Sequence, residues 1–223
     1  MYNTMTHIFN LVGKNDNIIV KVSFLEIYNE TIRDLIMPSD EILDVREDPI
    51  KGIQIAGLSV IEVKTAKEIL ELLTLGNKNR IQEATGANKT SSRSHAVLQI
   101  MCEHKKGKSI QIGKLSLIDL AGSERASTTG NRGIRMIEGA NINKSLLALG
   151  NCINMLHQNN TKNQKNHVPY RDSKLTRLLK DSLGGNCRTV MIANISPCES
   201  NFEDTINTLK YANRTKDLKT TLQ

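Results

Sequence analysis

Asp119 and Gly122 stand where an apolar run ends, and they are the first candidates for chemistry in the chain. The run, residues 115–120, has the length and composition of a strand buried in a sheet. Open α/β sheets bind ligands at such strand ends, where an aspartate can hold Mg²⁺ through water and a glycine lets a backbone amide approach a terminal phosphate. Taken alone, the pair more often indicates a strand that ends in a tight turn.

A second polar stretch, Asn-Lys-Thr-Ser-Ser-Arg-Ser-His at residues 88–95, precedes another strand-like run at 96–102. Residues 105–108 are typical of a hairpin turn, and with Lys106 and Gly107 as the turn residues Asp119 pairs with Ser94. A longer turn would shift this register but keep the two polar loops at the same end of the hairpin. The side chains and the glycine amide gathered there suit hydrolysis of a Mg²⁺-nucleoside triphosphate, and they come from Ser91, Ser92, Arg93, Ser94, Asp119, Gly122 and Glu124.

Several motifs, in this order, resemble those of the kinesin motor domain. Residues 88–95 and Asp119-Leu-Ala-Gly-Ser-Glu124 are similar to its switch I and switch II, and residues 167–177 resemble its microtubule-facing loop and helix. Residues 23–30 and 207–213 extend the resemblance over almost the whole chain. The wording of residues 185–197 is similar to the kinesin-eight branch.

The resemblance implies an α/β fold in three layers, of the kinesin and P-loop NTPase type. Its central sheet would be mixed, with helices on both faces. Residues 1–217 would form a partial motor domain, and residues 218–223 would begin the neck linker.

The resemblance also implies roles in binding ATP and Mg²⁺. Ser92 would place its hydroxyl group on Mg²⁺, and Asp119 would reach the same ion through water. Ser91 would help to orient the attacking water, and the amide of Gly122 would sense the γ-phosphate. These roles fit phosphoryl transfer, which is accelerated chiefly by positioning and charge stabilisation.

By the same resemblance, Arg93 and Glu124 would form an ion pair that closes the site. His95 would support the switch loop and would not bind a metal, since no spacing in the sequence matches a histidine metal motif. The expected nucleotide-binding residues are Asn88, Ser91, Ser92, Ser94, His95, Asp119 and Gly122.

The phosphate-binding P-loop of the family, G-x-x-x-x-G-K-[ST], does not occur in these 223 residues. The triplet Gly107-Lys108-Ser109 is no substitute, because Cys102 occupies the place of the first glycine and the triplet lies in the predicted hairpin turn. By resemblance, Met1 falls inside the helix after the P-loop, so a truncated or mis-started motor domain is expected, with the N-terminal strands absent. Such a chain should bind ATP weakly or not at all, and its exposed sheet edge should favour aggregation.

Thirty lysines and arginines against twenty-three acidic residues give a net charge of +7, which favours an acidic partner. Tubulin and nucleic acid both qualify. Three phenylalanines, four tyrosines and no tryptophan offer little surface for stacking bases, so nucleic acid is not the expected partner. No apolar run is long enough to span a membrane, and the four cysteines are widely spaced. A soluble protein of the cytoplasm, on cytoskeletal or spindle microtubules, is expected.

Periodicity predicts the elements that position these motifs. They are a helix at 1–12, a strand at 18–28, two short strands within 40–63, a helix from Thr65, a mobile loop at 127–139, a long helix through 142–156, a buried strand at 189–195 and a last helix from Ser200. Both Thr65-x-x-Glu68 and Ser200-x-x-Glu203 match the capping box. Val20, Val22 and Phe24 should share one face of the strand at 18–28, and Phe202, Ile206 and Leu209 are expected to face inward.

A further helix is predicted to carry four leucines of residues 175–183 on one side and Lys174, Arg177 and Lys180 on the other. A basic arc of this kind is usually a solvated face, but the resemblance implies that this one contacts the microtubule. The expected microtubule-binding residues are Lys51, Lys144, Arg171, Lys174, Arg177 and Lys180.

Three functions follow from these observations. The leading hypothesis is a part of an ATP-driven microtubule motor, with dimerisation left to regions outside the chain. The alternative is a non-catalytic tubulin-binding fragment, and the two differ in whether microtubules stimulate ATP hydrolysis. A nucleic-acid binder, supported by charge alone, would show a salt-sensitive shift with DNA and none with microtubules.

Overall fold

The computed structural model describes residues 2–13, 17–49, 52–82, 93–122, 134–162 and 166–216. The chain forms two compact units. Unit 1 comprises residues 1–44 and 57–121, and unit 2 comprises residues 45–56 and 122–223.

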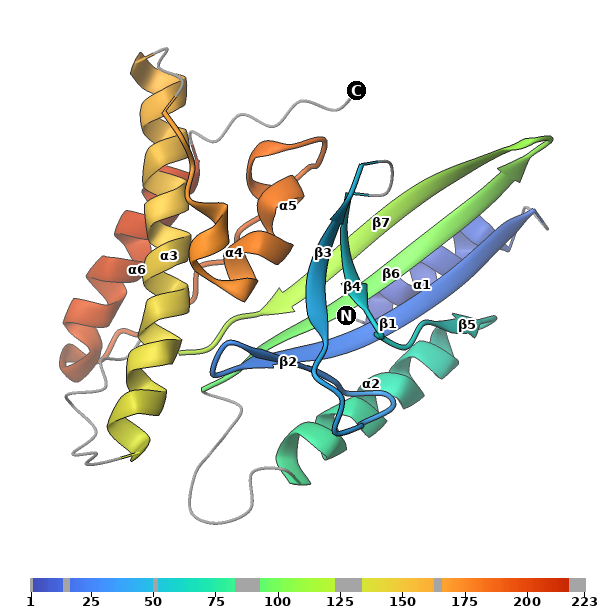
Figure 1. The fold of residues 1–223 in the computed structure, drawn as a ribbon, viewed down its shortest axis with the longest axis horizontal. Coiled ribbons are helices and arrows are strands. Elements are labelled where there is room, and N and C mark those ends of the chain that lie inside the picture. Colours follow the sequence, from blue (N-terminus) through green and yellow to red (C-terminus); the bar gives the residue numbers. More distant parts are fainter. Residues whose placement is uncertain are drawn as a thin grey trace. The chain divides into compact units, whose positions relative to one another are not determined.

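The sheet of unit 1 has the strand order β2-β1-β6-β7, and β5 pairs with β1. Its strands are β1 (Ile18–Tyr28), β2 (Thr31–Asp34), β5 (Ile61–Val63), β6 (His95–Lys106) and β7 (Ser109–Asp119). Figure 1 shows β1, β6 and β7 as one long ladder with the helices α1 (Tyr2–Val12) and α2 (Ala66–Gln82) beside it. The helix at the start of the chain and the strand at 18–28 are therefore confirmed. A mixed sheet was expected, but every strand pair of unit 1 that the structure describes is antiparallel.

The hairpin between β6 and β7 turns at Gly107 and Lys108, because Lys106 pairs with Ser109. The predicted turn at Lys106 and Gly107 was therefore wrong, and Asp119 lies opposite Ala96 instead of Ser94. The physical reason is the glycine, whose φ of +59° suits the first position of a type II′ turn. The shift is two residues, so the same side chains stay on each face, and Ser94 and Asp119 still lie at one end of the hairpin. The Gly-Lys-Ser triplet lies in this turn, where a P-loop cannot form.

The core of unit 1 lies between one face of its sheet and the two helices. Val20, Val22 and Phe24 of β1 are all buried there, as their alternation predicted. Half of the predicted capping box is present at the start of α2, where the Glu68 amide donates to Thr65 Oγ1 over 3.2 Å. The Glu68 carboxylate accepts from the Thr65 hydroxyl group and from the Lys64 amide, one residue before the amide that the motif expects. The strands and the helix that carry the site residues are therefore held by a packed apolar core.

Unit 2 contains the hairpin of β3 (Asp44–Asp48) and β4 (Gly52–Ala56) and most of the C-terminal half. Its helices are α3 (Ile134–Lys162), α4 (Lys174–Leu178), α5 (Lys180–Gly184) and α6 (Phe202–Thr215), with short 3-10 turns at Tyr170–Asp172 and Glu199–Asn201. Figure 1 shows α3 between α6 and the α4–α5 pair. The long predicted helix is confirmed, but it begins at Ile134, so the second half of the predicted loop at 127–139 is helical.

The basic helix predicted over 174–183 is divided at Leu179, whose ψ of 0° leaves the helical region. Its hydrogen bonds still cross the division, from the Leu179 amide to Leu175 and from the Leu183 amide to Leu179. All four leucines, Leu175, Leu178, Leu179 and Leu183, are buried as predicted. Helix α4 begins with a capping box that the sequence analysis missed, formed by Ser173 and Thr176.

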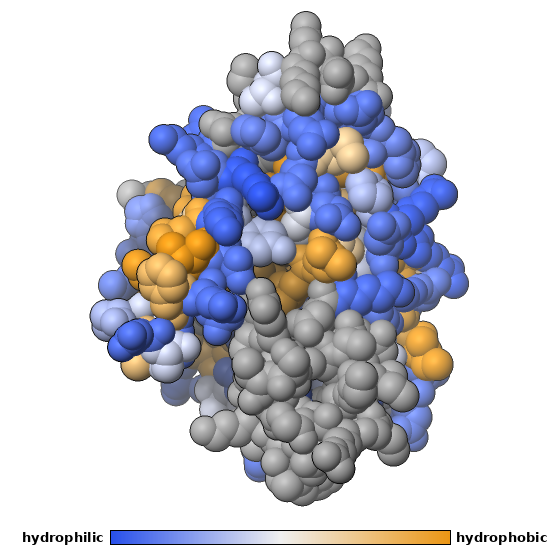
Figure 2. Space-filling model, turned by 90° about the vertical axis from the view of Figure 1, so that its left-hand side faces the viewer, coloured by the Kyte–Doolittle hydropathy of each residue, from blue (hydrophilic) through white to orange (hydrophobic). Residues whose placement is uncertain are grey.

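The segment at 189–195 contradicts its prediction, because the structure has no strand there. Val190 is 84% exposed and Ile192 is 81% exposed. A buried strand needs a neighbour that pairs with its backbone, and none of the described residues pairs with this one. On the face of the molecule shown in Figure 2, apolar patches are exposed among hydrophilic side chains.

The last helix begins later than predicted, at Phe202, with Asn201 as the residue before it and no side-chain cap. The predicted capping box was wrong because a 3-10 turn occupies Glu199–Asn201, and the Ser200 hydroxyl group contacts Asn201 instead. Phe202 is 64% exposed and Leu209 is 45% exposed, so neither faces inward as predicted. None of the described helices has the length and apolar character needed to cross a lipid bilayer.

Candidate functional site

Arg80, near the end of α2, joins the two stretches that resemble the switches. Its Nε atom donates to Ser94 Oγ over 3.1 Å, Nη2 donates to the Ser94 carbonyl over 2.9 Å, and Nη1 donates to Asp119 Oδ2 over 3.1 Å. The Arg80 side chain is only 6% exposed, whereas that of Asp119 is 72% exposed. One buried guanidinium group therefore anchors the first loop and holds a carboxylate that still faces solvent.

Glu26 of β1 is the buried counter-charge of this arginine. Its Oε1 atom lies 3.4 Å from Arg80 Nε, and its side chain is 2% exposed. The strand register puts Glu26, Ala96 and Asp119 in one row across three strands, so both carboxylates share a face of the sheet. An isolated buried carboxylate would be very unfavourable, which explains why an arginine lies beside it.

Neither Glu26 nor Arg80 was among the predicted site residues. A signal was present, because Glu26 continues the alternation of Val20, Val22 and Phe24, the apolar residues predicted to share one face of the strand. A carboxylate on such a face requires a buried cation, and the predicted helix before the first polar loop was the place to look for it.

His95 links the start of β6 to the segment after β7. The Ala121 amide donates to His95 Nδ1 over 3.0 Å, and the His95 side chain is buried. Burial, followed by the charge of Arg80, lowers the pKa of His95 from 6.5 to about 4, while Asp119 opposes this shift. The imidazole is therefore neutral near pH 7 and accepts through Nδ1, so its proton is on Nε2.

The predicted site is only partly within the described residues. Arg93 lies half-buried in the turn before β6, and Gly122 is half-buried after β7. The other predicted residues, namely Asn88, Ser91, Ser92, Glu124 and Lys51, lie outside the described residues. The ion pair of Arg93 with Glu124 therefore stays a prediction.

The described residues fit one side of a site for a metal-bound triphosphate. No group of three metal-binding side chains occurs among them. Asp119 is exposed but already paired with Arg80, which suits contact with a hydrated Mg²⁺ better than direct ligation by several carboxylates. Backbone amides and a lysine in a glycine-rich loop, which would hold the other phosphates, are not part of this sequence.

The predicted basic surface of unit 2 includes an ion pair. Lys180 contacts Glu47 of β3. The hydrogen bond and charge of Lys180, followed by the charges of Arg171 and Arg177, lower the pKa of Glu47 below its usual value. Glu47 is therefore paired with Lys180, and Arg171 and Arg177 add weaker positive charge to its surroundings. Lys144 is exposed on α3, and Lys174 is partly exposed at the start of α4.

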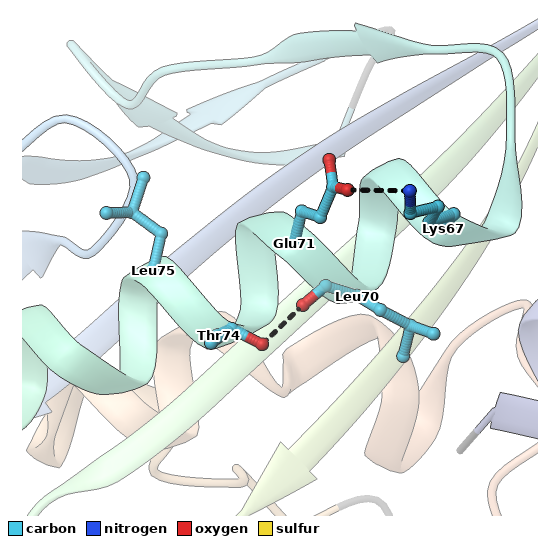
Figure 3. Close-up of a pocket in the computed structure, with 5 residues that line it drawn as sticks. All are labelled: Lys67, Leu70, Glu71, Thr74 and Leu75. Carbon is cyan, nitrogen blue, oxygen red and sulfur yellow. Dashed lines mark hydrogen bonds and ion pairs between the residues drawn. The ribbon is translucent and has the colours of Figure 1, made fainter.

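A shallow hollow of about 410 Å³ lies elsewhere, on the outer side of α2 (Figure 3). Its polar side chains interact within the helix, Lys67 with Glu71 and Thr74 with the Leu70 carbonyl. None of the residues singled out by the motifs lines it, so it is not the candidate site.

Comparison with known proteins agrees with this arrangement. A family profile described as "Kinesin motor domain" matches residues 1–218. Kinesin-like protein KIF19 of Xenopus laevis is 58% identical over 206 residues, which cover 90% of this chain and 20% of that protein. Kinesin-like protein KIF18B of Gallus gallus is 54% identical over 231 residues, covering 100% of this chain and 29% of that protein. Kinesin-like protein KIN-8B of Arabidopsis thaliana is 52% identical over 223 residues, which cover 99% of this chain and 27% of that protein.

Solved structures also match. A KIF14 dimer with AMP-PNP, in complex with a microtubule, has a TM-score of 0.88 and 38% identity, covering 100% of this chain and 65% of that chain. The structure of a fast kinesin has a TM-score of 0.88 and 41% identity, and the match covers 100% of this chain and 63% of that chain. This chain thus spans less than two thirds of these structures and 20 to 29% of the curated relatives described above. The relatives confirm the resemblance to the kinesin-eight branch. The fold, the family profile and the relatives together show that the chain belongs to the kinesin motor domain family.

Proposed function

We propose that this chain is the switch-bearing and microtubule-binding part of an ATP-driven motor that moves on microtubules. The observation that carries the proposal is the Arg80 cluster, in which one buried guanidinium group holds Ser94 and Asp119 at the same end of the sheet. Such a link lets a change at one switch reach the other. The KIF14 relative, whose structure contains AMP-PNP and a microtubule, supports the same proposal.

In this proposal the residues of the chain position the reacting groups. Ser92 and Asp119 hold hydrated Mg²⁺, Ser91 orients the attacking water, and the Gly122 amide contacts the γ-phosphate. Bound Mg²⁺ would supply positive charge that stabilises the phosphates during transfer. Arg80 fixes the position of the Asp119 carboxylate through their 3.1 Å ion pair.

Other side chains keep the loops in place. His95 holds the backbone at Ala121, next to Gly122, and Asn88 and Ser94 complete the nucleotide site. Closure of Arg93 onto Glu124 excludes bulk water from the site.

The finer architecture also belongs to this proposal. Residues 1–217 would form part of a three-layer motor domain with helices on both faces of its sheet, and residues 218–223 would begin a neck linker. The protein would act in the cytoplasm, on the microtubule cytoskeleton.

A non-catalytic tubulin-binding fragment is the second candidate. The specific observation in its favour is the sequence itself, which has the basic residues around Glu47 but no P-loop motif. In that case the chain would bind microtubules without turnover. ATP hydrolysis separates the two candidates when it is measured on the chain joined to a kinesin segment that carries a P-loop. Microtubules should then stimulate hydrolysis only if the chain is part of a motor.

Cosedimentation with microtubules tests the shared part of both candidates. We expect the chain to bind, and the triple replacement Arg171→Gln, Lys174→Gln and Arg177→Gln to weaken binding strongly. A matched control neutralises the exposed Lys105, Lys106 and Lys108 at the β6–β7 turn, which removes the same charge from the other unit. Equal losses in the two triple variants would show that binding follows net charge and not this surface.

A further inference from the structure

The basic surface of unit 2 contains its own carboxylate. Glu47 is paired with Lys180, and the charges of Arg171 and Arg177 also act on it. Lys180 and Glu47 keep 38% and 47% of their side-chain surface exposed, so both remain accessible to another molecule. An anionic partner would therefore meet a cation that is already neutralised.

Asp181, the residue after Lys180, binds the other strand of the hairpin that carries Glu47. Asp181 Oδ2 accepts a hydrogen bond of 3.4 Å from the Ile53 amide of β4. A Cβ atom at Gly52 would lie 2.9 Å from the same oxygen, so a larger residue would have to displace the Asp181 carboxylate, and the φ of +69° also favours glycine. Two adjacent residues of α5 thus hold both strands of the β3–β4 hairpin, one through Glu47 and the other through the backbone.

The fold itself reflects this attachment. Residues 45–56 belong to unit 2, although the segments before and after them in sequence belong to unit 1. The hairpin is therefore held by the basic helix pair, and Glu47 stays beside Lys180 through a fixed backbone and not only through a flexible side-chain contact.

We propose that Glu47 is an internal counter-ion that occupies Lys180 in the free protein and competes for it with the acidic surface of tubulin. The choice of tubulin rests on the proposed function. An exposed ion pair is weak, so a surface with several carboxylates can displace Glu47 while the Asp181 contact keeps the hairpin attached. Glu47 would thus weaken binding and reduce the number of cations that the free protein presents.

The test compares Glu47→Gln, Lys180→Gln and the double variant in the 223-residue chain. The matched control is Glu71→Gln, which removes a carboxylate from another exposed lysine pair, on α2 of unit 1. Binding to microtubules and to poly-L-glutamate is measured from low to moderate salt. We expect Glu47→Gln to tighten binding about threefold at low salt, with a steeper loss on salt addition, because Lys180 is released. Glu71→Gln should leave binding unchanged.

The double variant identifies the cause. If Glu47 acts through Lys180, the gain from Glu47→Gln largely disappears when Lys180 is already glutamine. An equal gain in both backgrounds would show a general effect of net charge and overturn the proposal, as would unchanged or weaker binding of Glu47→Gln with an unchanged thermal midpoint. Tighter binding of Glu47→Gln to poly-L-glutamate, with no binding of any variant to microtubules, would support the role of Glu47 as a counter-ion but exclude tubulin as the partner. That result would refute the proposed function and not the counter-ion.

Discussion

Replacing Arg80 with methionine should destabilise unit 1 strongly, because it leaves Glu26 as an unpaired buried carboxylate. Glu26 is 2% exposed and Arg80 is 6% exposed, so this pair is screened little by water. Removing one partner of such a pair costs about 3–5 kcal/mol. The Asp119 contact adds about 1 kcal/mol at most, since that carboxylate is 72% exposed.

Urea denaturation, followed by circular dichroism, measures these differences in the free energy of unfolding. The companion variant Asp119→Asn should lose about 1 kcal/mol or less, because it affects only the exposed contact. The double variant Arg80→Met with Glu26→Met should recover most of the loss, since no buried charge is left unpaired. If Arg80→Met does not fold, Arg80→Lys is measured in its place, because it keeps the positive charge beside Glu26. Similar losses for Arg80→Met and Asp119→Asn would refute the assignment of Glu26 as the main partner.

Three further predictions concern other sites. The pKa of His95 is lowered from 6.5 to about 4 in the folded chain. As the pH falls, the unfolded chain therefore takes up this proton at a higher pH than the folded chain does. About 3 kcal/mol of stability that is present above pH 6.5 should be lost as the pH falls to 4. His95→Asn, which keeps an acceptor for the Ala121 amide, should flatten this pH dependence in denaturation experiments, and an unchanged slope would argue against a buried neutral histidine. Gly76→Ala should destabilise the chain by about 1–3 kcal/mol despite better helix propensity, because the new Cβ would lie 2.3 Å from Phe24 Cδ1, and Phe24→Leu should relieve the loss. Titration calorimetry should detect weak or no ATP binding to these 223 residues, and micromolar affinity would contradict the importance given to the P-loop.

Local patterns predicted many elements, because neighbouring residues determine them. The alternation of Val20, Val22 and Phe24 located β1 and its buried face, and Thr65 with Glu68 located the start of α2. The same reasoning failed at 189–195, since an apolar run becomes a buried strand only when another strand pairs with it. It also misplaced the β6–β7 turn, where the φ of a single glycine decided the register.

The candidate site divides in the same way. The sequence alone determined which residue types stand in the two polar loops, and therefore the chemistry that they suit. Only the tertiary structure decided that Arg80 anchors them, because Glu26, Ala96 and Asp119 come from three strands that meet through cross-strand pairing. The structure also decided that Lys180 faces a carboxylate from residue 47. Contacts between residues far apart in the chain depend on strand register and helix packing, which no local pattern specifies.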